Sequence, residues 1–284
     1  MVDLVVDDEV ILSPPITVYP PRRWPGLNLE ETWRMRSVCM VLTQRLLKAR
    51  YRQAVVGAGW ALLQPLLMML AFTVFFGFFA KLPSEGVPYP LFFFSGLIVW
   101  QIISKQLAEG SGSVLANSTL VTRIYFPRVY FPISVALSSV VDFGFNLIAL
   151  GVLMLYYGWL PATQIVFVPI ILILVYAASL GMTLWLAALD VAYRDVSVLV
   201  PFLVQVGFFL VPIIYPASIV PPEYQALYFL NPFALGIEAF RWAVLGTPMP
   251  PDVGWIAGTV VAALLLVSGY IFFRQREDTF ADVI

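Results

Sequence analysis

The sequence predicts an all-α integral membrane protein with six transmembrane helices, an N-terminal amphipathic interface helix and a re-entrant helical hairpin before the last span. Apolar residues make up 61% of the 284-residue chain and charged residues only 12%, a composition typical of membrane proteins. Runs of about 20 apolar residues recur, which is the length that an α-helix needs to cross a bilayer. The placement of lysine and arginine between these runs orients them.

Six apolar runs are assigned as spans, and they cover about residues 59–80, 90–110, 131–157, 163–189, 197–215 and 253–273. The even number places both termini on the same side of the membrane. Of the 16 lysine and arginine residues, only Lys81 and Arg241 fall in gaps on the opposite side. By the positive-inside rule, both termini are therefore cytoplasmic.

The predicted organisation has an N-terminal extension, an interface helix, a transmembrane domain and a short cytoplasmic tail, at residues 1–28, 29–56, 57–274 and 275–284. The first residues are acidic and contain no lysine or arginine, which argues against a cleaved secretory signal. We expect an intact, mostly disordered cytoplasmic extension there. Cys39 is the only cysteine and the chain has no histidine, which excludes an internal disulfide and any multi-cysteine metal site.

The segment after the proline-rich stretch 20–25 has a helical period but is too polar to cross the membrane. Basic residues occupy one face, and the other face is apolar at i, i+3, i+4 spacing, with Met35, Val38, Cys39, Leu42, Leu46 and Ala49. Asn28 and Glu31 resemble a capping box, and the basic end suits the helix dipole and anionic headgroups. We expect a helix on the membrane surface that also contacts a cytoplasmic partner or a substrate headgroup. A plain topogenic anchor is the alternative.

The gap between the second and third spans, residues 112–130, is cytoplasmic by this topology. A short helix is predicted to begin at Asn117 or Ser118 and to end before Pro127. It would project a small knob of polar and apolar residues that suits a cleft in another protein. An ordinary connecting loop would have much the same pattern.

Residues 216–252 are apolar but repeatedly interrupted. The longest continuous piece, Phe233 to Gly246, would reach about 21 Å as a helix, against a hydrocarbon core of about 30 Å. Asn231-Pro232 is expected to turn the chain between helices at 223–230 and 233–245. This predicts a re-entrant hairpin dipping in from outside, in which Glu238 and Arg241 neutralise each other. A hydrophobic loop lying flat on the lipid is the alternative.

Few ionisable residues fall inside the spans. Asp142 lies near the middle of the third, with Asn146 one turn later on the same face; it is expected to hydrogen-bond between helices or to line a hydrated path. Lys105 and Glu109 are predicted to form a surface ion pair. A structural role is assigned to the cluster at the inner end of the fourth span, which contains Asp190, Arg194 and Asp195.

Several enzyme signatures are missing from the chain. It has no G-x-x-x-x-G-K-[ST] loop and no HExxH, and it has no nucleophile elbow. No catalytic residue, metal site, bound cofactor or nucleic-acid partner is therefore predicted. Aromatic residues make up 15% of the chain, and most are expected in interfacial belts. A subset could line a conduit and stack against the C–H faces of sugar rings.

The order of these segments, together with four local patterns, resembles the membrane subunit of type 2 ABC exporters. The patterns are Tyr51-x5-Gly57-x2-Trp60-x4-Pro65, Arg194-Asp195 after the fourth span, Pro212-x2-Tyr215 and Asn231-Pro232. Within that group the chain looks like the O-antigen polysaccharide and teichoic acid exporter permeases. The resemblance covers the chain from about residue 30 onward.

The resemblance implies a homodimer in the cytoplasmic (inner) membrane, with two copies of a separate ATPase subunit that carry the ATP and Mg²⁺. The conduit would lie at the dimer interface and pass a polyprenyl-pyrophosphate-linked polysaccharide. Coupling to the ATPase is assigned to Ser118, Thr119, Leu120, Arg123 and Tyr125. The residues expected to meet the substrate headgroup are Arg45, Lys48, Arg50, Tyr51, Arg52 and Trp60.

The resemblance also implies a conduit wall and an outer gate. The wall is assigned to Phe75, Phe94, Trp100, Asp142, Phe208, Phe209 and Tyr215. The gate, within the hairpin at residues 216–250, is assigned to Asn231, Pro232, Glu238 and Arg241. The expected function is ATP-driven export of an O-antigen-type polysaccharide. Exporters of teichoic acid, drugs or small lipids are alternatives, and a membrane enzyme acting on lipid-linked sugars is a more distant one.

Overall fold

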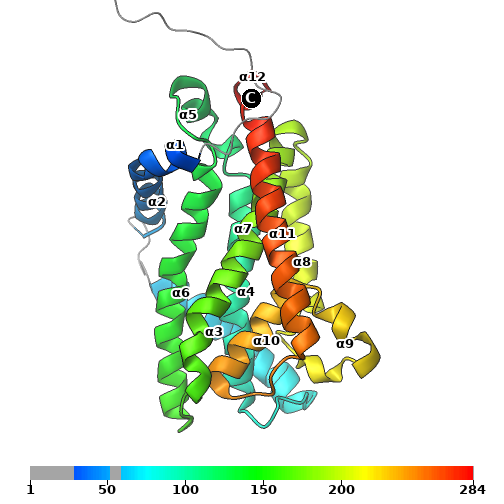
Figure 1. Cartoon of the computed structure of the whole chain (residues 1–284). Coiled ribbons are helices and arrows are strands. Elements are labelled where there is room, and N and C mark those ends of the chain that lie inside the picture. Colours follow the sequence, from blue (N-terminus) through cyan, green and yellow to red (C-terminus); the bar gives the residue numbers. More distant parts are fainter. Residues whose placement is uncertain (1–28, 52–58, 284) are drawn as a thin grey trace, which may run out of the picture.

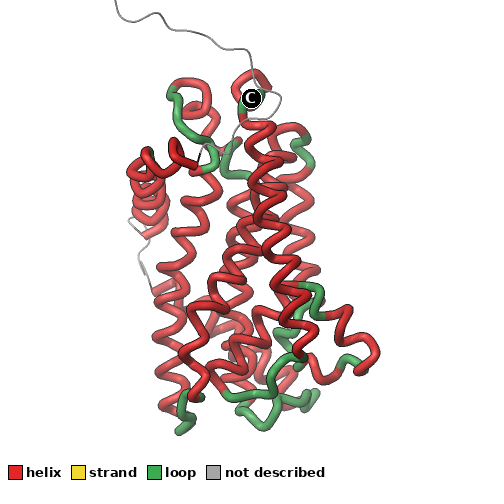
Figure 2. Tube along the Cα trace, in the orientation of Figure 1, coloured by secondary structure: helices red, strands yellow, loops and turns green. Residues whose placement is uncertain are grey.

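The computed structural model describes residues 29–51 and 59–283, and within them it forms helices joined by turns and short loops (Figures 1 and 2). The long helices pack side by side into a bundle. The predictions for residues 1–28 and for Arg52 lie outside the described residues. The proposed boundaries of the four parts of the chain stay predictions.

Among the described residues, five helical segments are long and apolar enough to cross a membrane. They are α3 (Gly59–Phe72) continued by the π-helical η1 (Thr73–Phe79), α4 (Tyr89–Ser111), α6 (Tyr130–Tyr156), α7 (Val168–Ala192) preceded by the 3-10 turn η3 (Thr163–Phe167), and α11 (Asp252–Glu277). Each coincides closely with a predicted span. The expectation of an all-helical membrane protein is confirmed.

The remaining predicted span, 197–215, forms a shorter helix, α8 (Val196–Leu210). Its 15 residues reach about 22 Å, which is less than the hydrocarbon core of about 30 Å. The helix ends because Val211 is extended and Pro212, which follows it, disfavours helical geometry in the residue before it. The count of six spans stays a prediction.

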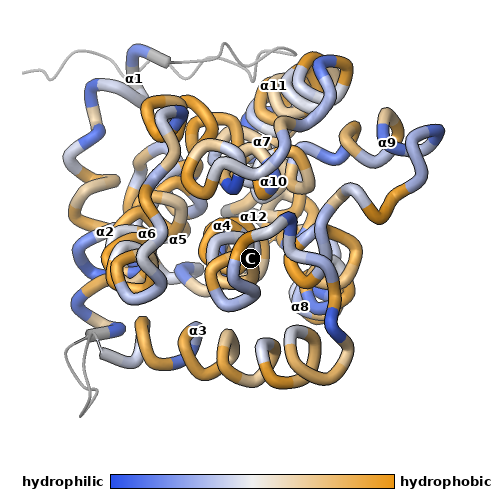
Figure 3. The backbone as a smooth tube through the Cα atoms, turned by 90° about the horizontal axis from the view of Figure 1, so that it is seen from below, coloured by the Kyte–Doolittle hydropathy of each residue, from blue (hydrophilic) through white to orange (hydrophobic). Residues whose placement is uncertain are grey.

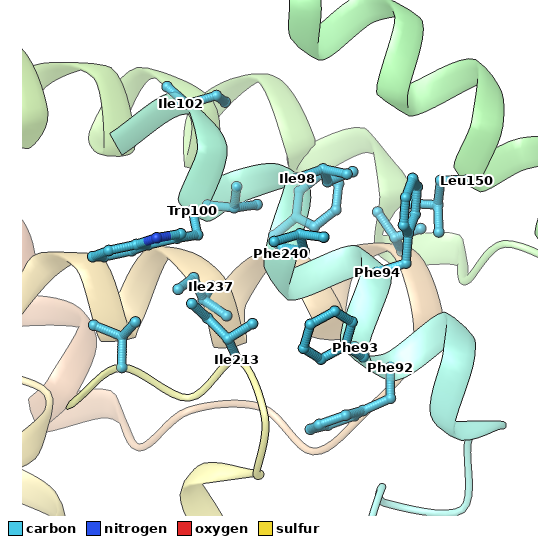
Figure 4. Packing of buried hydrophobic residues seen from close by; sticks show 14 of the residues in the cluster. Phe92, Phe93, Phe94, Ile98, Trp100, Ile102, Leu150, Ile213, Ile237 and Phe240 are labelled. Carbon is cyan, nitrogen blue, oxygen red and sulfur yellow. The ribbon is translucent and has the colours of Figure 1, made fainter. Parts of the chain in front are cut away.

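Helix α4 forms the centre of the bundle. Residues 91–100 are all buried, and α3, α6, α7, α8 and α10 (Pro232–Leu245) pack around them. Figure 4 shows the side chains of Phe92, Phe93 and Phe94 among residues from α6, α10 and the loop after α8. Helix α3 differs from the others. In Figure 3, which looks along the bundle, α3 is seen lengthwise, and only 6% of the apolar segment Leu62–Phe79 is buried.

Helices α7 and α11 approach each other through two glycines. A Cβ atom on Gly269 would lie 2.2 Å from the carbonyl oxygen of Gly181, so any side chain there would force the backbones apart. Because lipid tails are as apolar as the helices, membrane helices associate mainly through van der Waals packing, and small residues at a crossing allow the backbones to approach closely enough for it. Trp185 stacks on Phe272 beside the crossing, with ring centroids 3.9 Å apart.

The predicted interface helix is present as two helices, α1 (Leu29–Arg34) and α2 (Arg36–Tyr51), with a turn at Met35. Helix α2 runs across the bundle axis, since it is compact in Figure 1 and lengthwise in Figure 3. Its apolar face is confirmed, with Cys39 and Leu42 buried. That face packs on α6 and the neighbouring loop rather than on lipid alone, and Ala49, predicted on it, is exposed.

The short elements divide between the two ends of the bundle (Figure 1). Helix α5 (Ser118–Arg123), preceded by the 3-10 turn η2 (Leu115–Asn117), lies near α1 and the C-terminal α12 (Phe280–Val283). The 3-10 turn η4 (Ala217–Ile219), α9 (Pro222–Tyr228) and α10 lie at the opposite end. This separation agrees with the predicted topology, in which α5 is cytoplasmic and α9 and α10 are external.

Candidate functional site

A cavity of about 530 Å³, with charged and polar groups set in a largely apolar wall, lies in the half of the bundle nearest α5, between α2, α3, α4 and α6. Its polar lining residues are Arg50, Gln64, Gln101, Ser104, Lys105, Glu109, Ser139, Asp142 and Asn146, and Trp60 is among the apolar ones. Pockets for small molecules occupy roughly 300–1,000 Å³. The cavity is therefore large enough for a headgroup but not for a polymer.

Two cations and two carboxylates form a connected network in this cavity. Arg50 Nη2 donates to Glu109 Oε2 at 2.7 Å, and Arg50 Nη1 donates to Asp142 Oδ2 at 2.7 Å. Lys105 Nζ also donates to Asp142 Oδ2. The side chains of Arg50 and Glu109 are 35% and 49% exposed, whereas those of Lys105 and Asp142 are 10% and 19% exposed. The network thus runs from the cavity rim to its interior.

The predicted pair of Lys105 with Glu109 is wrong. Lys105 reaches across to Asp142 on α6, and Glu109 instead pairs with Arg50 at the end of α2. The two side chains are one turn apart on α4, but each meets a different neighbouring helix, and the charges on those helices decide the pairing.

The structure bears out interhelical bonding by Asp142, which accepts from Arg50 of α2 and Lys105 of α4, whereas its place on a hydrated path stays a prediction. Asn146 Nδ2 donates to Gln101 Oε1 at 2.9 Å and joins α6 to α4, and Ser139 Oγ lies 3.0 Å from the Tyr176 hydroxyl on α7. Asp142 itself lines the cavity and is ion-paired. Interhelical hydrogen bonding and a polar lining position therefore coincide on one face of α6.

The residues predicted to meet a headgroup are divided by the fold. Arg50 and Trp60 line the cavity, whereas Arg45 and Lys48 are exposed and lie outside its lining. The side chain of Tyr51 and all of Arg52 lie outside the described residues. The cavity is also lined by Gln64, Gln101, Ser104 and Lys105, which had no predicted binding role. Polar residues at i, i+4 and i+8 in the apolar α4, namely Gln101, Lys105 and Glu109, are the signal that could have found this face.

The predicted conduit wall is also divided. Phe94, Trp100 and Phe208 are at most 6% exposed and pack in the core, so in this arrangement they do not form a free wall. Phe75 and Phe209 are 62% and 55% exposed. Tyr215 is half-buried, and its hydroxyl donates to the carbonyl of Phe209 at 3.1 Å. The lining role of the exposed residues stays a prediction.

The hairpin helices form where they were predicted. Asn231 Oδ1 accepts the backbone N–H of Phe233 at 3.0 Å and caps α10, and Pro232 fills its first turn, both standard features of a helix start. Helix α10 packs on α4 and α7 and is buried along most of its length. This contradicts a loop lying flat on the lipid for α10. Its depth in a membrane, and therefore its re-entrant character, stays a prediction.

Arg241 and Glu238 form the predicted ion pair, with Arg241 Nη1 and Glu238 Oε1 3.3 Å apart. The guanidinium is fully buried and also donates to the carbonyl oxygens of Phe92, Pro212 and Ile213. Glu238 accepts the N–H of Ala217 at 2.8 Å. These side chains therefore tie α10 to α4 and to the loop after α8. Their role in an outer gate stays a prediction.

The short helix predicted between the second and third spans is present as α5, and its cytoplasmic position stays a prediction. Thr119, Arg123 and Tyr125 are exposed, and Ser118 and Leu120 are half-buried. Val121 and Phe126 anchor this segment, at 3% and 6% exposure, in a cluster with α6, α7 and α11. The buried residues thus hold the segment against the bundle, while its exposed side chains face outward.

A polytopic helical membrane protein with a charged, ion-paired cavity among its spans has the architecture of a membrane permease. No group of three or more histidine, cysteine, aspartate or glutamate residues that could hold a metal occurs in the part of the chain that the structure describes. The family described as ABC-2 type transporter matches residues 37–245, which is most of the chain. The protein belongs to this family.

Relatives of known name match over nearly their whole length. The chain is 29% identical over 259 residues to the O-antigen export system permease protein RfbA of Myxococcus xanthus, covering 90% of this chain and 98% of that protein. It is 24% identical to RfbA of Klebsiella pneumoniae, covering 86% of this chain and 94% of the relative. It is 22% identical to the polysialic acid transport protein KpsM of Escherichia coli, covering 82% of this chain and 91% of that protein.

Proposed function

We propose that this chain is the membrane permease of an ATP-driven ABC exporter that moves a polyprenyl-linked polysaccharide of the O-antigen type across the cytoplasmic membrane. The observation that carries the proposal is the match to export permeases over almost their entire length. The cavity with charged groups on the α5 side of the bundle supports it, because that side is predicted to face the cytoplasm, where a lipid-linked substrate would first present its headgroup. The chain supplies the path, and ATP is hydrolysed elsewhere.

The working unit is proposed to be a homodimer with two ABC ATPase subunits and with both termini in the cytoplasm. An ATP-dependent partner is expected from membership of the ABC-2 family. Helix α5 suits the docking contact, since it combines exposed Thr119, Arg123 and Tyr125 with a buried base. The exposed apolar faces of α3, η1 and α8, including Phe75, Phe78 and Phe202, are where a second copy is proposed to pack.

Depletion of this chain in its native host tests the proposal. Lipid-linked glycans are then separated into cytoplasmic-face and surface pools, and their sugars are analysed. Export predicts that long polyprenyl-linked polymer accumulates inside while surface polymer disappears. The sugars of the accumulated polymer identify the substrate and separate O-antigen from teichoic acid. Unchanged pools would reject polysaccharide export.

An exporter of small lipids or drugs is the second candidate, because the cavity has the size of a small-molecule site. In that case the reconstituted complex of permease and ATPase would hydrolyse ATP faster when such compounds are added. A polysaccharide exporter would respond instead to its lipid-linked glycan.

A further inference from the structure

The cavity contains a charge-balanced set of ion-pairing groups. The two cations, Arg50 and Lys105, are both held by carboxylates in this structure, with Asp142 shared between them and Glu109 bound at 2.7 Å by Arg50. Isolated charges within a membrane protein are costly unless they are paired. The carboxylates therefore keep the cations inside the cavity when no other anion is present.

The rest of the lining has the chemistry that recognises a sugar. Gln64, Gln101 and Ser104 line the cavity with amide and hydroxyl groups, and the amide oxygen Oδ1 of Asn146 is buried without a hydrogen-bond partner among the described residues. Trp60 lines the same cavity and is 54% exposed, so its ring is available for stacking. A buried acceptor without a partner is costly, and a ligand hydroxyl would satisfy it.

We infer that this cavity binds a diphosphate that carries a sugar, and that Asp142 and Glu109 are internal counterions that the diphosphate displaces from Arg50 and Lys105. The inference rests on the proposed function, in which the substrate is a polyprenyl-linked polysaccharide, and it adds that a diphosphate joins the polyprenyl chain to the first sugar. It names the recognised part as the diphosphate and the first sugar. It also places Lys105 of α4, and not the exposed Arg45 or Lys48, at the centre of the site.

The geometry supports displacement rather than simple addition. Arg50 donates through Nη2 to Glu109 and through Nη1 to Asp142, and phosphate oxygens accept from a guanidinium as carboxylate oxygens do, so a diphosphate could supply one acceptor to each nitrogen. Glu109 is 49% exposed and sits at the rim, where it can turn toward water when it is released. Two cations match the two negative charges of a diphosphate diester. The exchange therefore leaves no unpaired cation at either stage.

Displacement predicts opposite effects for the two kinds of charge. Removing a cation weakens diphosphate binding, whereas removing the competing carboxylate strengthens it. A purely structural network predicts that every one of these substitutions weakens binding or leaves it unchanged. The rim residue Glu109 is the better carboxylate to remove, because Asp142 also joins α6 to α2 and α4.

The test uses the purified full chain in nanodiscs and measures the affinity for farnesyl-diphosphate-N-acetylglucosamine, a diphosphate diester that carries one sugar, with inorganic pyrophosphate as a soluble competitor. Arg50→Gln and Lys105→Gln are expected to lower the affinity about 10-fold each, the loss of one charge-assisted contact. Glu109→Gln is expected to raise it several-fold. Lys48→Gln, on the exposed face of α2, is the matched control and is expected to leave it unchanged. Thermal unfolding of each variant shows that the fold is retained.

Three results would overturn the inference. One is weaker binding in Glu109→Gln with normal thermal stability. Another is an equal loss in Lys48→Gln, which would indicate diffuse attraction to a basic surface. The third is binding of pyrophosphate but not of the farnesyl-diphosphate-linked sugar, which would indicate a site for soluble phosphates. Because binding is measured without export, the inference can fail while glycan depletion still supports the proposed function, and the reverse also holds.

Discussion

Gly96 on α4 leaves the space that the guanidinium of Arg241 occupies. A Cβ atom on Gly96 would lie 2.4 Å from Arg241 Nη2 and 3.4 Å from the Cα of Ile213. The guanidinium passes over this glycine to reach the carbonyl of Ile213 at 2.8 Å, and it lies 3.7 Å from the ring centroid of Phe92. A fully buried cation is thus accommodated by the absence of a side chain on the neighbouring helix.

Gly96→Ala is expected to destabilise the protein by about 1–3 kcal/mol, the usual cost of overpacking a core. The added methyl would displace Arg241 from its carbonyl partners. Gly144→Ala on α6 is the matched control, because a Cβ there meets nothing within 4 Å. That change should be neutral or stabilising by about 0.5–1 kcal/mol, since alanine favours helix over glycine. Unfolding of both variants in detergent measures the difference, and equal stabilities would contradict the packing argument.

Arg241→Met is expected to cost about 3–5 kcal/mol, because Glu238 would remain as a buried charge without its partner. Carbonyl oxygens of Phe92, Pro212 and Ile213 would also lose a donor. The double variant Glu238→Gln/Arg241→Met should recover part of this loss by removing the unpaired charge. Lys48→Met, at an exposed position, should have little effect. Thermal unfolding compares the four proteins, and a double variant less stable than Arg241→Met would contradict the pairing.

Gly269→Ala is expected to separate α7 and α11 and to destabilise the bundle by about 1–3 kcal/mol. The new methyl would overlap the carbonyl of Gly181, and a backbone atom cannot turn aside as a side chain can. Gly151→Ala on α6 is the control, since its Cβ meets nothing within 4 Å. The aggregation temperatures of the Gly269→Ala and Gly151→Ala variants are compared. An aggregation temperature of Gly269→Ala equal to that of the unmodified protein would contradict the close approach of α7 and α11.

Glu277→Gln is expected to loosen the segment that follows α5. The buried carboxylate of Glu277 accepts from the backbone N–H of Arg128 and pairs with Arg274. Loss of its charge weakens both contacts, so residues 124–128 should be cleaved faster by a protease that cuts after arginine or aromatic residues. Asp278→Asn, at the exposed neighbouring position, should cleave at the original rate. Identical digestion of the two variants would show that Glu277 does not hold this segment.

Cys39 is expected to react slowly with maleimides although it is the only thiol. Burial raises the pKa of Cys39 from 9.0 to about 11, which lowers the thiolate fraction at pH 8 about 100-fold. A cysteine at Met40, which is 59% exposed, should react far faster in a Cys39→Ser background. The Cys39 rate should keep rising with pH up to about 11, because only the thiolate attacks. Equal rates at pH 8 would mean that this face of α2 is open.

Much of the fold could be predicted from the sequence because its signals are local. Five spans follow from apolar runs of sufficient length. The start of α10 follows from Asn231-Pro232, where capping and proline geometry act within a few residues. Helix α5 also begins where it was predicted, although the side chain of Asn117 does not cap it and instead donates to the carbonyl of Ser113. Periodicity also identified the face of α2 that contains Cys39 and Leu42.

The tertiary structure decided which partner each of these faces and charges would have. Helical spacing placed Lys105 and Glu109 on one side of α4. In the structure, Lys105 pairs with Asp142 on α6, and Glu109 pairs with Arg50 on α2. Arg241 was counted as an external cation, yet the space at Gly96 buries it completely. The physical reason is that lipid and protein interior are similarly apolar. Hydrophobicity can therefore set the length and orientation of a membrane helix, but its neighbours are chosen by close packing and polar contacts between residues distant in the sequence.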